Sequence, residues 1–398
     1  MAVTLERPAP FRQAPPDPAR SASRPQRTGG ARPQHLDGAD ALRALAAVAV
    51  IVVHTTHWAL QDEGADAAVW PSVTLVARFC VPAFVLLTGL VLAYRYGDQP
   101  LGRDFLLRRA RRSVLPWLIW APIYCIAGLA LTGEVRPTWG AVGDWWSLGG
   151  GHLYFLILVP QLYLLMLLWP ARRRTAMLLA GAALALQVAL CASRLYAPMP
   201  GGVLHQGVLN HGFEEFPFWI GFFAVGIAAG RMLAVRGGRG LAAWPFALAV
   251  GPATVALLWL GARGAANPAY ADGTGAFLRP LMVPVTLAVC GSVLFGAPSL
   301  LRRMPRLQRA TSRLSTHSLG VYIVHPLLIA GFGRILARGL HAHLPVSIAA
   351  VLALTVVTAV TALWLAQAIA RTRLAVTIGA QRERRDAERE RELIGRAA

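Results

Sequence analysis

The feature that most constrains the fold of this chain is a series of ten apolar stretches, each about as long as a membrane-crossing helix. A hydrocarbon core roughly 30 Å thick requires about 20 apolar residues in an α-helix. Inside lipid, only helices and closed barrels satisfy every backbone polar group. The series therefore predicts an all-α fold, a polytopic membrane helical bundle of about ten transmembrane helices. The predicted spans lie near residues 41–60, 72–94, 113–132, 152–170, 175–192, 216–234, 243–261, 276–296, 318–337 and 345–370.

The composition excludes an ordinary soluble protein. Of 398 residues, 56% are hydrophobic and 15% are charged, whereas soluble domains carry about 25% charged residues. A net charge of +20 can indicate a nucleic-acid partner, but here the basic residues form short clusters between the apolar stretches. That distribution is typical of membrane topology. The expected partner is the lipid bilayer, and no nucleic acid is expected.

Arginine-rich loops alternate with arginine-poor loops along the chain. Arginines are frequent before the first span and again after the second, fourth, sixth and eighth spans. The positive-inside rule places these segments in the cytoplasm, which predicts cytoplasmic termini and a location in the cytoplasmic membrane. All 39 basic residues are arginine. Together with abundant Ala, Gly and Pro, this indicates a bacterium with a GC-rich genome.

The chain divides into three segments. Residues 1–35 are rich in Pro, Arg and Ala and lack the apolar core of a signal peptide, which predicts a disordered cytoplasmic arm. Residues 36–370 form the membrane domain. Residues 371–398 alternate opposite charges at helical spacing, which predicts a solvated cytoplasmic helix. Binding of this tail to anionic headgroups or to a partner stays open.

The first span carries two ionisable residues on one face. Arg43 and His54 are eleven positions apart, which at 100° per residue is close to three full turns and a rise of roughly 16 Å. An ionisable group inside a span costs about 2.5–3.5 kcal/mol on insertion scales. Either Arg43 extends to the surface while His54 packs as a hydrogen-bonded core residue, or this face lines a polar cavity where chemistry occurs.

A neutral imidazole suits two kinds of chemistry. It removes a proton from a hydroxyl as a general base, or attacks an activated acyl group as a nucleophile. His325 is a second histidine within a span, and its role stays open. The four cysteines, Cys80, Cys125, Cys191 and Cys290, lie in apolar stretches without metal-type spacing. They are interpreted as small core residues, and no metal is expected.

Two further arginine positions have alternative readings. The sequence RRARR at residues 108–112 precedes SVLPWLIW, and its charges either fix the topology or bind phosphates, which guanidinium groups do bidentately. Arg78 opens the second span on its external side. It either extends outward or faces an external cleft for an acceptor.

The order of these elements resembles one known family. The first element is LDGADALR, which ends at Arg43 and is followed, after ten residues, by His54. The later elements are VPAFVLLTG, LPWLIW, GHLYFL and SLGVYIVHP. The series is similar to the acyltransferase-3 family of integral membrane proteins, over about residues 36–370. The sequence departs from the family pattern at the extra residues before Arg43, at Thr88-Gly89 in place of Ser-Gly, and at Tyr154 in place of tryptophan.

The resemblance implies an activity. Family members transfer acyl groups, usually acetyl, from a cytoplasmic donor to sugars of cell-envelope polymers, and the closest branch acetylates envelope antigens. The implied donor is acetyl-CoA or another acyl-CoA, and the implied acceptor is an envelope glycan, a lipid-linked sugar or another secondary metabolite.

The resemblance also implies roles for individual residues. His54 and Arg43 are the expected catalytic residues, and Arg109 and Arg112 the expected donor-binding residues. The residues expected to bind substrate are Arg78, Glu215, Tyr322 and His325. His152 and Tyr154 are expected at the external interface, where an aromatic belt is the favoured interpretation of Tyr154.

Two other classes of function are alternatives. Ten spans with Pro and Gly breaks and intramembrane histidines also fit a transporter or flippase for lipid-linked saccharides. No internal repeat supports that reading. A non-catalytic scaffold is disfavoured because it gives no reason for two histidines inside spans.

Overall fold

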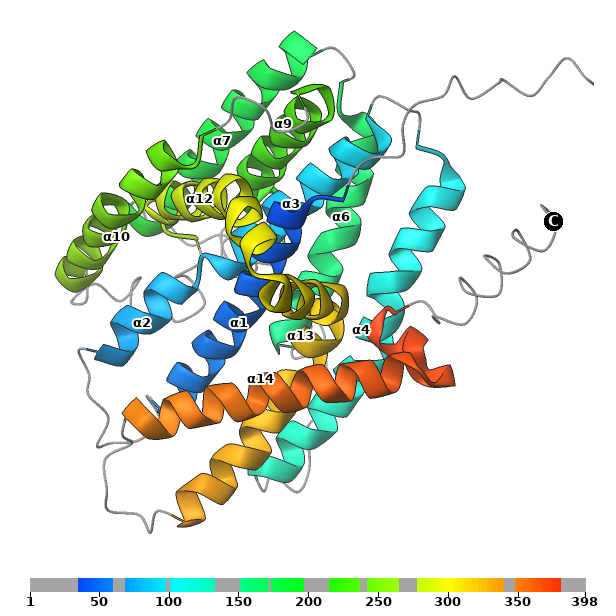
Figure 1. Cartoon of the computed structure of the whole chain (residues 1–398), viewed down its shortest axis with the longest axis vertical. Coiled ribbons are helices and arrows are strands. Elements are labelled where there is room, and N and C mark those ends of the chain that lie inside the picture. Colours follow the sequence, from blue (N-terminus) through cyan, green and yellow to red (C-terminus); the bar gives the residue numbers. More distant parts are fainter. Residues whose placement is uncertain are drawn as a thin grey trace, which may run out of the picture. The chain divides into compact units, whose positions relative to one another are not determined.

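Every predicted span coincides with a helix in the computed structural model (Figure 1). The structure describes residues 35–59, 69–97, 101–132, 151–170, 173–196, 215–236, 242–264, 278–339 and 348–380. Residues 1–34 of the predicted arm and residues 381–398 of the predicted tail lie outside this part. Apart from His35, the described residues belong to one unit, Leu36–Ala398.

The described residues form helices and no strands. The α-helices are α1 (Asp37–Ala59), α2 (Val69–Ala77), α3 (Cys80–Tyr96), α4 (Arg103–Thr132), α6 (Tyr154–Leu168), α7 (Arg173–Tyr196), α9 (Ile220–Arg236), α10 (Trp244–Gly264), α12 (Met282–Arg303), α13 (Pro305–Gly339) and α14 (Ile348–Ala370). The short 3₁₀ helices are η2 (Gly151–Leu153), η3 (Phe216–Phe218) and η5 (Arg373–Ile378).

Seven helical segments within the described ranges are long and apolar enough to cross a membrane. One of them is the continuous segment Val69–Tyr96, which joins α2 to α3. The apolar helices α6 and α9 are shorter, and α4 begins with the arginine cluster. The all-helical membrane bundle is therefore confirmed.

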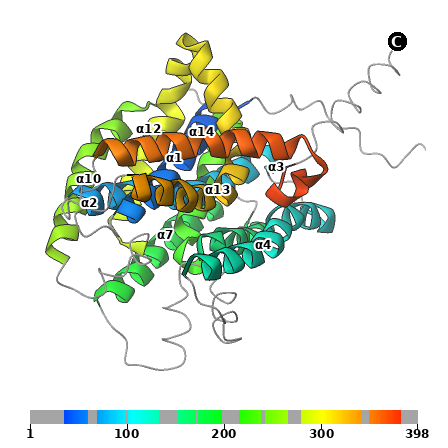
Figure 2. The same ribbon diagram turned by 90° about the horizontal axis from the view of Figure 1, so that it is seen from below.

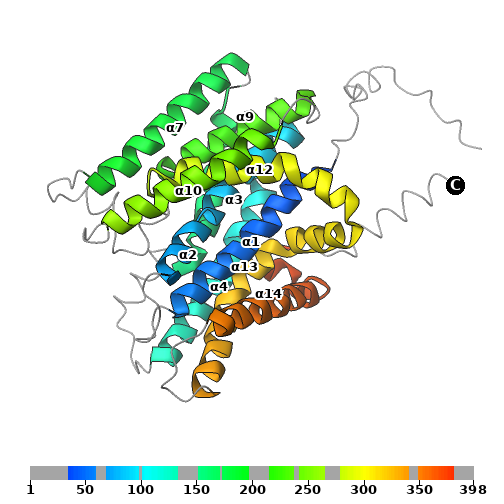
Figure 3. The same ribbon diagram turned by 60° about the vertical axis from the view of Figure 1, so that its left-hand side comes forward.

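Helix α1 has the most contacts with other helices in the site region. It packs against α2, α3, α12, α13 and α14, and Figure 3 shows it between α3 and α13. Small residues permit this close packing. At Gly38, for example, an added Cβ would overlap the carbonyl of Leu294 in α12. The helix that carries Arg43 and His54 is thus enclosed by other helices.

Helices α3 and α9 are in close contact through glycines. A Cβ added at Gly226 or Gly230 of α9 would overlap the carbonyl of Leu86 or Leu90 in α3. Gly89 of α3 faces the carbonyl of Phe223 in the same way. The four-residue spacing of Gly226 and Gly230 is the small-residue pattern that lets membrane helices approach closely.

Other helices expose apolar side chains. Leu178 of α7, Leu248 of α10 and Trp364 of α14 are largely exposed, as expected for side chains that face lipid. Helix α14 runs alongside α13 (Figure 2). The bundle therefore has an enclosed α1 and a lipid-facing set of outer helices.

The predicted second span, 72–94, is interrupted. A turn at Arg78 and Phe79 separates α2 from α3. Pro82 has no N–H to donate to the carbonyl of Arg78, four residues earlier, so a regular helix cannot continue there. The segment Val69–Tyr96 still has the length and composition of a span, and Arg78 lies buried at the turn within it.

The prediction of a solvated helix was wrong for the start of the tail. Residues Arg373–Ile378 form the 3₁₀ helix η5, in which Ala375 and Ile378 are buried. The indole Nε1 of Trp120 donates to the Thr377 carbonyl at 2.9 Å. Gly379, with φ of 65°, lies so close to the Arg112 carbonyl that a side chain there would clash. Apolar contact and this close approach hold the segment against α4.

Candidate active site

Three histidines from separate elements meet beside the C-terminal part of α1. The ring centroid of His54 lies 5.0 Å from that of His325 in α13 and 6.1 Å from that of His152 in η2. The rings of His152 and His325 are 5.8 Å apart. These three rings, named here the histidine cluster, form a nearly equilateral triangle. The sequence predicted two of its members, His54 and His325.

His325 has a defined hydrogen-bonding state. It is fully buried, and its Nδ1 lies 2.8 Å from the Tyr322 carbonyl and 3.2 Å from the Val321 carbonyl. Carbonyl oxygens only accept, so Nδ1 carries the proton and Nε2 carries the lone pair. Pro326 has no N–H and cannot bond the Tyr322 carbonyl, four residues earlier. That carbonyl is therefore left for the imidazole.

The Nε2 atoms of His152 and His325 are both buried without a hydrogen-bond partner among the described residues. Buried polar nitrogens are normally hydrogen bonded, and exceptions in native structures require an explanation. Two such nitrogens in one cluster, each on a ring beside His54, are consistent with a place for a ligand or substrate group.

Tyrosines hold His152 in place. The Tyr322 hydroxyl donates to the His152 carbonyl, and the Tyr124 ring centroid is 4.4 Å from the His152 ring. The Tyr124 hydroxyl donates to the Ile323 carbonyl at 2.5 Å, which joins α4 to α13. Tyr322 thus belongs to the site as a support for the histidine cluster, and no sequence signal identified Tyr124.

Sequence reasoning placed His152 and Tyr154 at the external interface. Instead, His152 is half-buried and belongs to the histidine cluster, and Tyr154 is 8% exposed. An aromatic belt residue would face lipid, so that interpretation of Tyr154 is wrong. The signal that was available for His152 is its place in GHLYFL, at the start of an apolar stretch.

Arg78 lies inside the bundle. Its side chain is only 8% exposed, and it is within Coulombic range of His54 and His57. An arginine that extended outward would be exposed, so the burial of Arg78 disagrees with that reading, and its contact with an acceptor stays a prediction. The turn between α2 and α3 gives it this position.

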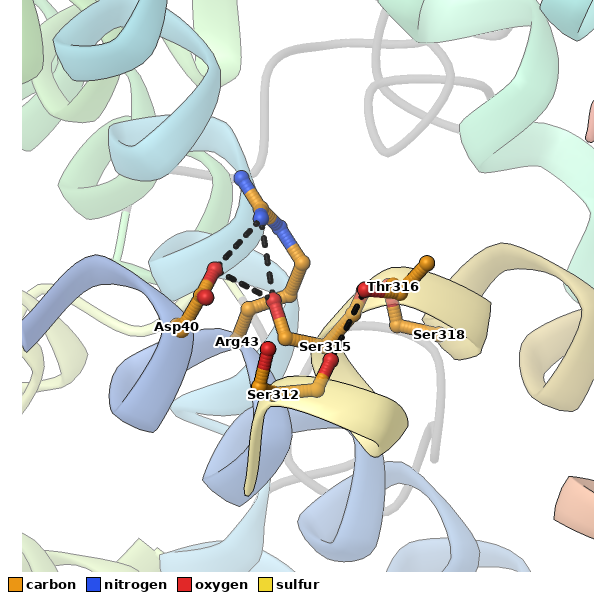
Figure 4. Close-up of polar contacts among 6 residues, drawn as sticks. All are labelled: Asp40, Arg43, Ser312, Ser315, Thr316 and Ser318. Carbon is orange, nitrogen blue, oxygen red and sulfur yellow. Dashed lines mark hydrogen bonds and ion pairs between the residues drawn. The ribbon is translucent and has the colours of Figure 1, made fainter. Parts of the chain in front are cut away.

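Arg43 is fixed by two neighbours at the other end of α1 (Figure 4). Its Nη1 lies 3.4 Å from the Asp40 Oδ1 and donates to the Ser315 hydroxyl at 3.1 Å. The Ser315 hydroxyl in turn donates to the same Asp40 oxygen at 2.7 Å. The other terminal nitrogen points away from Asp40 and Ser315 in Figure 4. Asp40 and Ser315 therefore hold one terminal nitrogen of the guanidinium, and the other terminal nitrogen points away from these two residues.

The arginines of α4 divide into two faces. Arg108 and Arg111 are exposed, whereas Arg109 and Arg112 are half-buried. The Arg109 guanidinium carbon lies 5.7 Å from the Phe105 ring centroid and 5.9 Å from that of Tyr163 in α6. Distances of this size permit cation–π attraction.

Coulombic interactions connect Arg43 with Arg109 and Arg95, and Arg112 with Arg109 and Arg95. These four arginines, from α1, α3 and α4, are named here the arginine cluster. Like charges gathered in this way repel one another, so an anion bound among them would be stabilised.

The remaining predicted site residue is Glu215. It is half-buried and precedes η3, next to Phe216, whose N–H is held by the Gln161 side chain of α6 at 3.1 Å. Its role in binding substrate stays a prediction.

The cysteines form no disulfide bonds. All four cysteines are free, as predicted. Across the described ranges, no three His, Cys, Asp or Glu side chains are placed to hold a metal ion.

The arginine cluster and the histidine cluster draw on several helices, and α1 contributes one residue to each, Arg43 and His54. A family model described as an acyltransferase domain, that of the acyltransferase-3 family, matches residues 36–366. No curated protein and no solved structure matches the chain. The matched region contains both ends of the site and all but the last few residues of α14, and the chain belongs to the acyltransferase-3 family of membrane acyltransferases.

Proposed function

We propose that this enzyme transfers an acyl group, acetyl in the simplest case, from a cytoplasmic acyl-CoA to a hydroxyl of an envelope glycan or lipid-linked sugar. The proposal follows the family branch that acetylates envelope antigens. It includes a location in the cytoplasmic membrane of a GC-rich bacterium, with residues 36–370 as the catalytic domain between a cytoplasmic arm and tail.

The observation that carries the proposal is the spacing of the two clusters along α1. Arg43 and His54 are separated by a rise of roughly 16 Å. The phosphopantetheine arm of coenzyme A has thirteen bonds between its phosphorus and its sulfur. At the ~3.5 Å per three bonds of an extended amide chain, it reaches roughly 15 Å. A donor whose phosphates lie among the arginines would thus present its thioester near His54.

The arginine cluster supports binding of the donor. Coenzyme A carries a pyrophosphate and a 3′-phosphate, and guanidinium groups bind such groups in bidentate fashion. Arg43, Arg109 and Arg112 are the proposed ligands. The half-burial of Arg109 and Arg112, in contrast to their exposed neighbours, favours these two over the rest of the RRARR sequence.

The proposed reaction needs one base and one stabiliser of negative charge. As the acceptor oxygen attacks the thioester carbonyl, His54 takes the hydroxyl proton, the new C–O bond forms and the C–S bond breaks. The proton finally passes to the departing thiolate. Arg78, buried near His54, is placed to stabilise the negative charge that develops on the carbonyl oxygen.

Transport of lipid-linked saccharides was the alternative expectation. Membership of an acyltransferase family does not support it. The predicted orientation stays part of the proposal, and reporter fusions after residue 306 test it. A fusion there that is active only outside the cell would contradict cytoplasmic binding of the donor.

The activity is tested with purified protein in proteoliposomes. Radiolabelled acetyl-CoA is supplied on one side, together with an extract of envelope glycans or lipid-linked sugars, and label in the acceptor fraction is measured. Acetyl-pantetheine, which has the thioester without the phosphates, is the matched donor. Transfer from acetyl-CoA and little from acetyl-pantetheine is expected. Equal use of the two donors would contradict a role for the arginine cluster.

A further inference from the structure

We propose that His325 is the proton-relay partner of His54, and that the Tyr322 carbonyl released by Pro326 prepares it for that role. This inference rests on the proposed function of His54 and extends it. It concerns the route of the proton within the histidine cluster.

The tautomer of His325 leaves one of its ring nitrogens basic. Its Nδ1–H is committed to the carbonyls of Tyr322 and Val321, so its Nε2 is a base with no partner in the described residues. A histidine that served only to satisfy the Tyr322 carbonyl needs no further contact. The burial of an unused, basic nitrogen beside another imidazole is the feature that a purely structural role leaves unexplained.

The His54 and His325 rings lie close together. The His54 and His325 ring centroids are 5.0 Å apart. Each ring nitrogen lies roughly 1 Å from its centroid, so rings at this separation reach an N···N distance of about 3 Å when their nitrogens face each other, which is hydrogen-bond length.

Backbone carbonyls would stabilise the positive charge of a protonated His325. In a serine-protease triad, a carboxylate orients the histidine and stabilises its imidazolium. Here two backbone carbonyls at Nδ1 of His325 supply partial negative charge, and the proline in α13 leaves one of them without its helical donor.

The relay consists of two proton transfers. His54 accepts the acceptor's hydroxyl proton at one ring nitrogen and passes the proton on its other nitrogen to Nε2 of His325. His54 ends neutral with its tautomer exchanged, and His325 becomes an imidazolium. After the C–S bond breaks, the two transfers run in reverse and the thiolate receives the proton. No group outside the two substrates and the two histidines is required.

The test uses two substitutions that separate the nitrogens of His325. The amide N–H₂ of Asn occupies nearly the place of Nδ1, so His325→Asn keeps a donor for the Tyr322 carbonyl and removes the base. His325→Ala removes both. We expect kcat to fall by about 10²-fold in His325→Asn, with unchanged KM values for donor and acceptor and an unchanged melting temperature. His325→Ala is expected to lose both activity and thermal stability.

Wild-type kcat in a folded His325→Asn protein would overturn the relay and leave His325 with a structural role. His54→Ala is measured in parallel. Activity in His54→Ala would contradict the proposed function itself, whereas loss in His54→Ala with full activity in His325→Asn contradicts only the relay. The double variant is expected to be no slower than His54→Ala, because residues that act as a unit are not additive. Additive losses would count against the relay.

A measurement on the native protein covers the case in which His325→Asn fails to fold. Single-turnover rates are recorded in mixtures of H₂O and D₂O. Two protons moving in one step produce a curved dependence of the rate on the deuterium fraction, and one proton produces a straight line. A straight line with a clear isotope effect would overturn the proposal.

Discussion

The arginine cluster and the histidine cluster both involve α1, but their polar groups are held in different ways. Arg43 is bound on one edge by the side chains of Asp40 and Ser315, and Arg109 by aromatic rings. In the histidine cluster, backbone carbonyls accept from His325 and two tyrosines contact His152, and two ring nitrogens have no described partner. Under the proposed function, the first arrangement would hold cations for donor binding and the second would leave bases available for proton transfer.

This comparison predicts which kinetic parameter each region controls. Loss of a base lowers kcat because its interaction matters in the transition state, whereas loss of a uniform binding contact raises KM. Substitutions in the histidine cluster are therefore expected to act on kcat, and substitutions in the arginine cluster on the KM for the donor.

The largest effect is expected from His54→Ala. Removal of a general base typically lowers the rate by about 10²–10⁴-fold, and the donor KM should stay close to that of the wild type. Acetyl transfer is measured in proteoliposomes, with the amount of inserted protein as the control. His57→Ala is the matched variant, because His57 is exposed one turn away, and it should keep most of the activity. Near-normal transfer by His54→Ala would remove the basis for separating the two regions.

Arg43→Ala is expected to have the second largest effect. A hydrogen bond to a charged group contributes about 1.5–3 kcal/mol, so the donor KM should rise by roughly 10- to 100-fold while the acceptor KM changes little. Arg43→Lys distinguishes charge from geometry. Lysine keeps the charge without the planar fork, so little recovery is expected if the contact is bidentate. A fall in kcat with an unchanged donor KM would contradict the assignment.

The α4 arginines give a matched pair of double variants. Arg109 and Arg112 are half-buried, and Arg108 and Arg111 on the same helix are exposed. Replacing the first pair with Gln should raise the donor KM by roughly tenfold, about 1.4 kcal/mol, and replacing the second pair should change it less than about twofold. Both double variants remove the same charge, so equal effects would mean that the cluster acts only through net charge or topology.

The sequence was sufficient for the positions of the helices and for two of the three residues of the histidine cluster. Length and hydropathy predicted the helical bundle, because the cost of exposing polar backbone in lipid leaves few alternatives, and seven of the described helical segments are long and apolar enough to span. His54 and His325 could be recognised as ionisable residues within apolar stretches. The role of Arg109 and Arg112 in binding a donor stays a prediction.

The rest depended on three-dimensional contacts that hydropathy does not encode. His152 lies near the start of an apolar stretch, so its position along the chain suggested the interface, and only the packing of η2 beside α13 brings it to His54. The docking of η5 depends on the close approach of Gly379 to α4. The inward position of Arg78 depends on Pro82.

The smallest effect is expected from Ser315→Ala. The Ser315 hydroxyl accepts from Arg43 and donates to Asp40 (Figure 4), so its removal leaves the ion pair at 3.4 Å without the bridging group. One neutral hydrogen bond contributes about 1 kcal/mol, which corresponds to roughly a fivefold rise in the donor KM.

Thr316→Ala is the control for that substitution. Thr316 is the next residue of α13, is exposed, and bonds only the Ser312 carbonyl of its own helix in the described contacts. Its loss should leave the donor KM unchanged. If Ser315→Ala instead lowers kcat with the donor KM constant, the support of Arg43 would affect chemistry as well as binding. Donor binding at one end of α1 and chemistry at the other would then not be independent, because a change beside Arg43 would affect the histidines about three helical turns away.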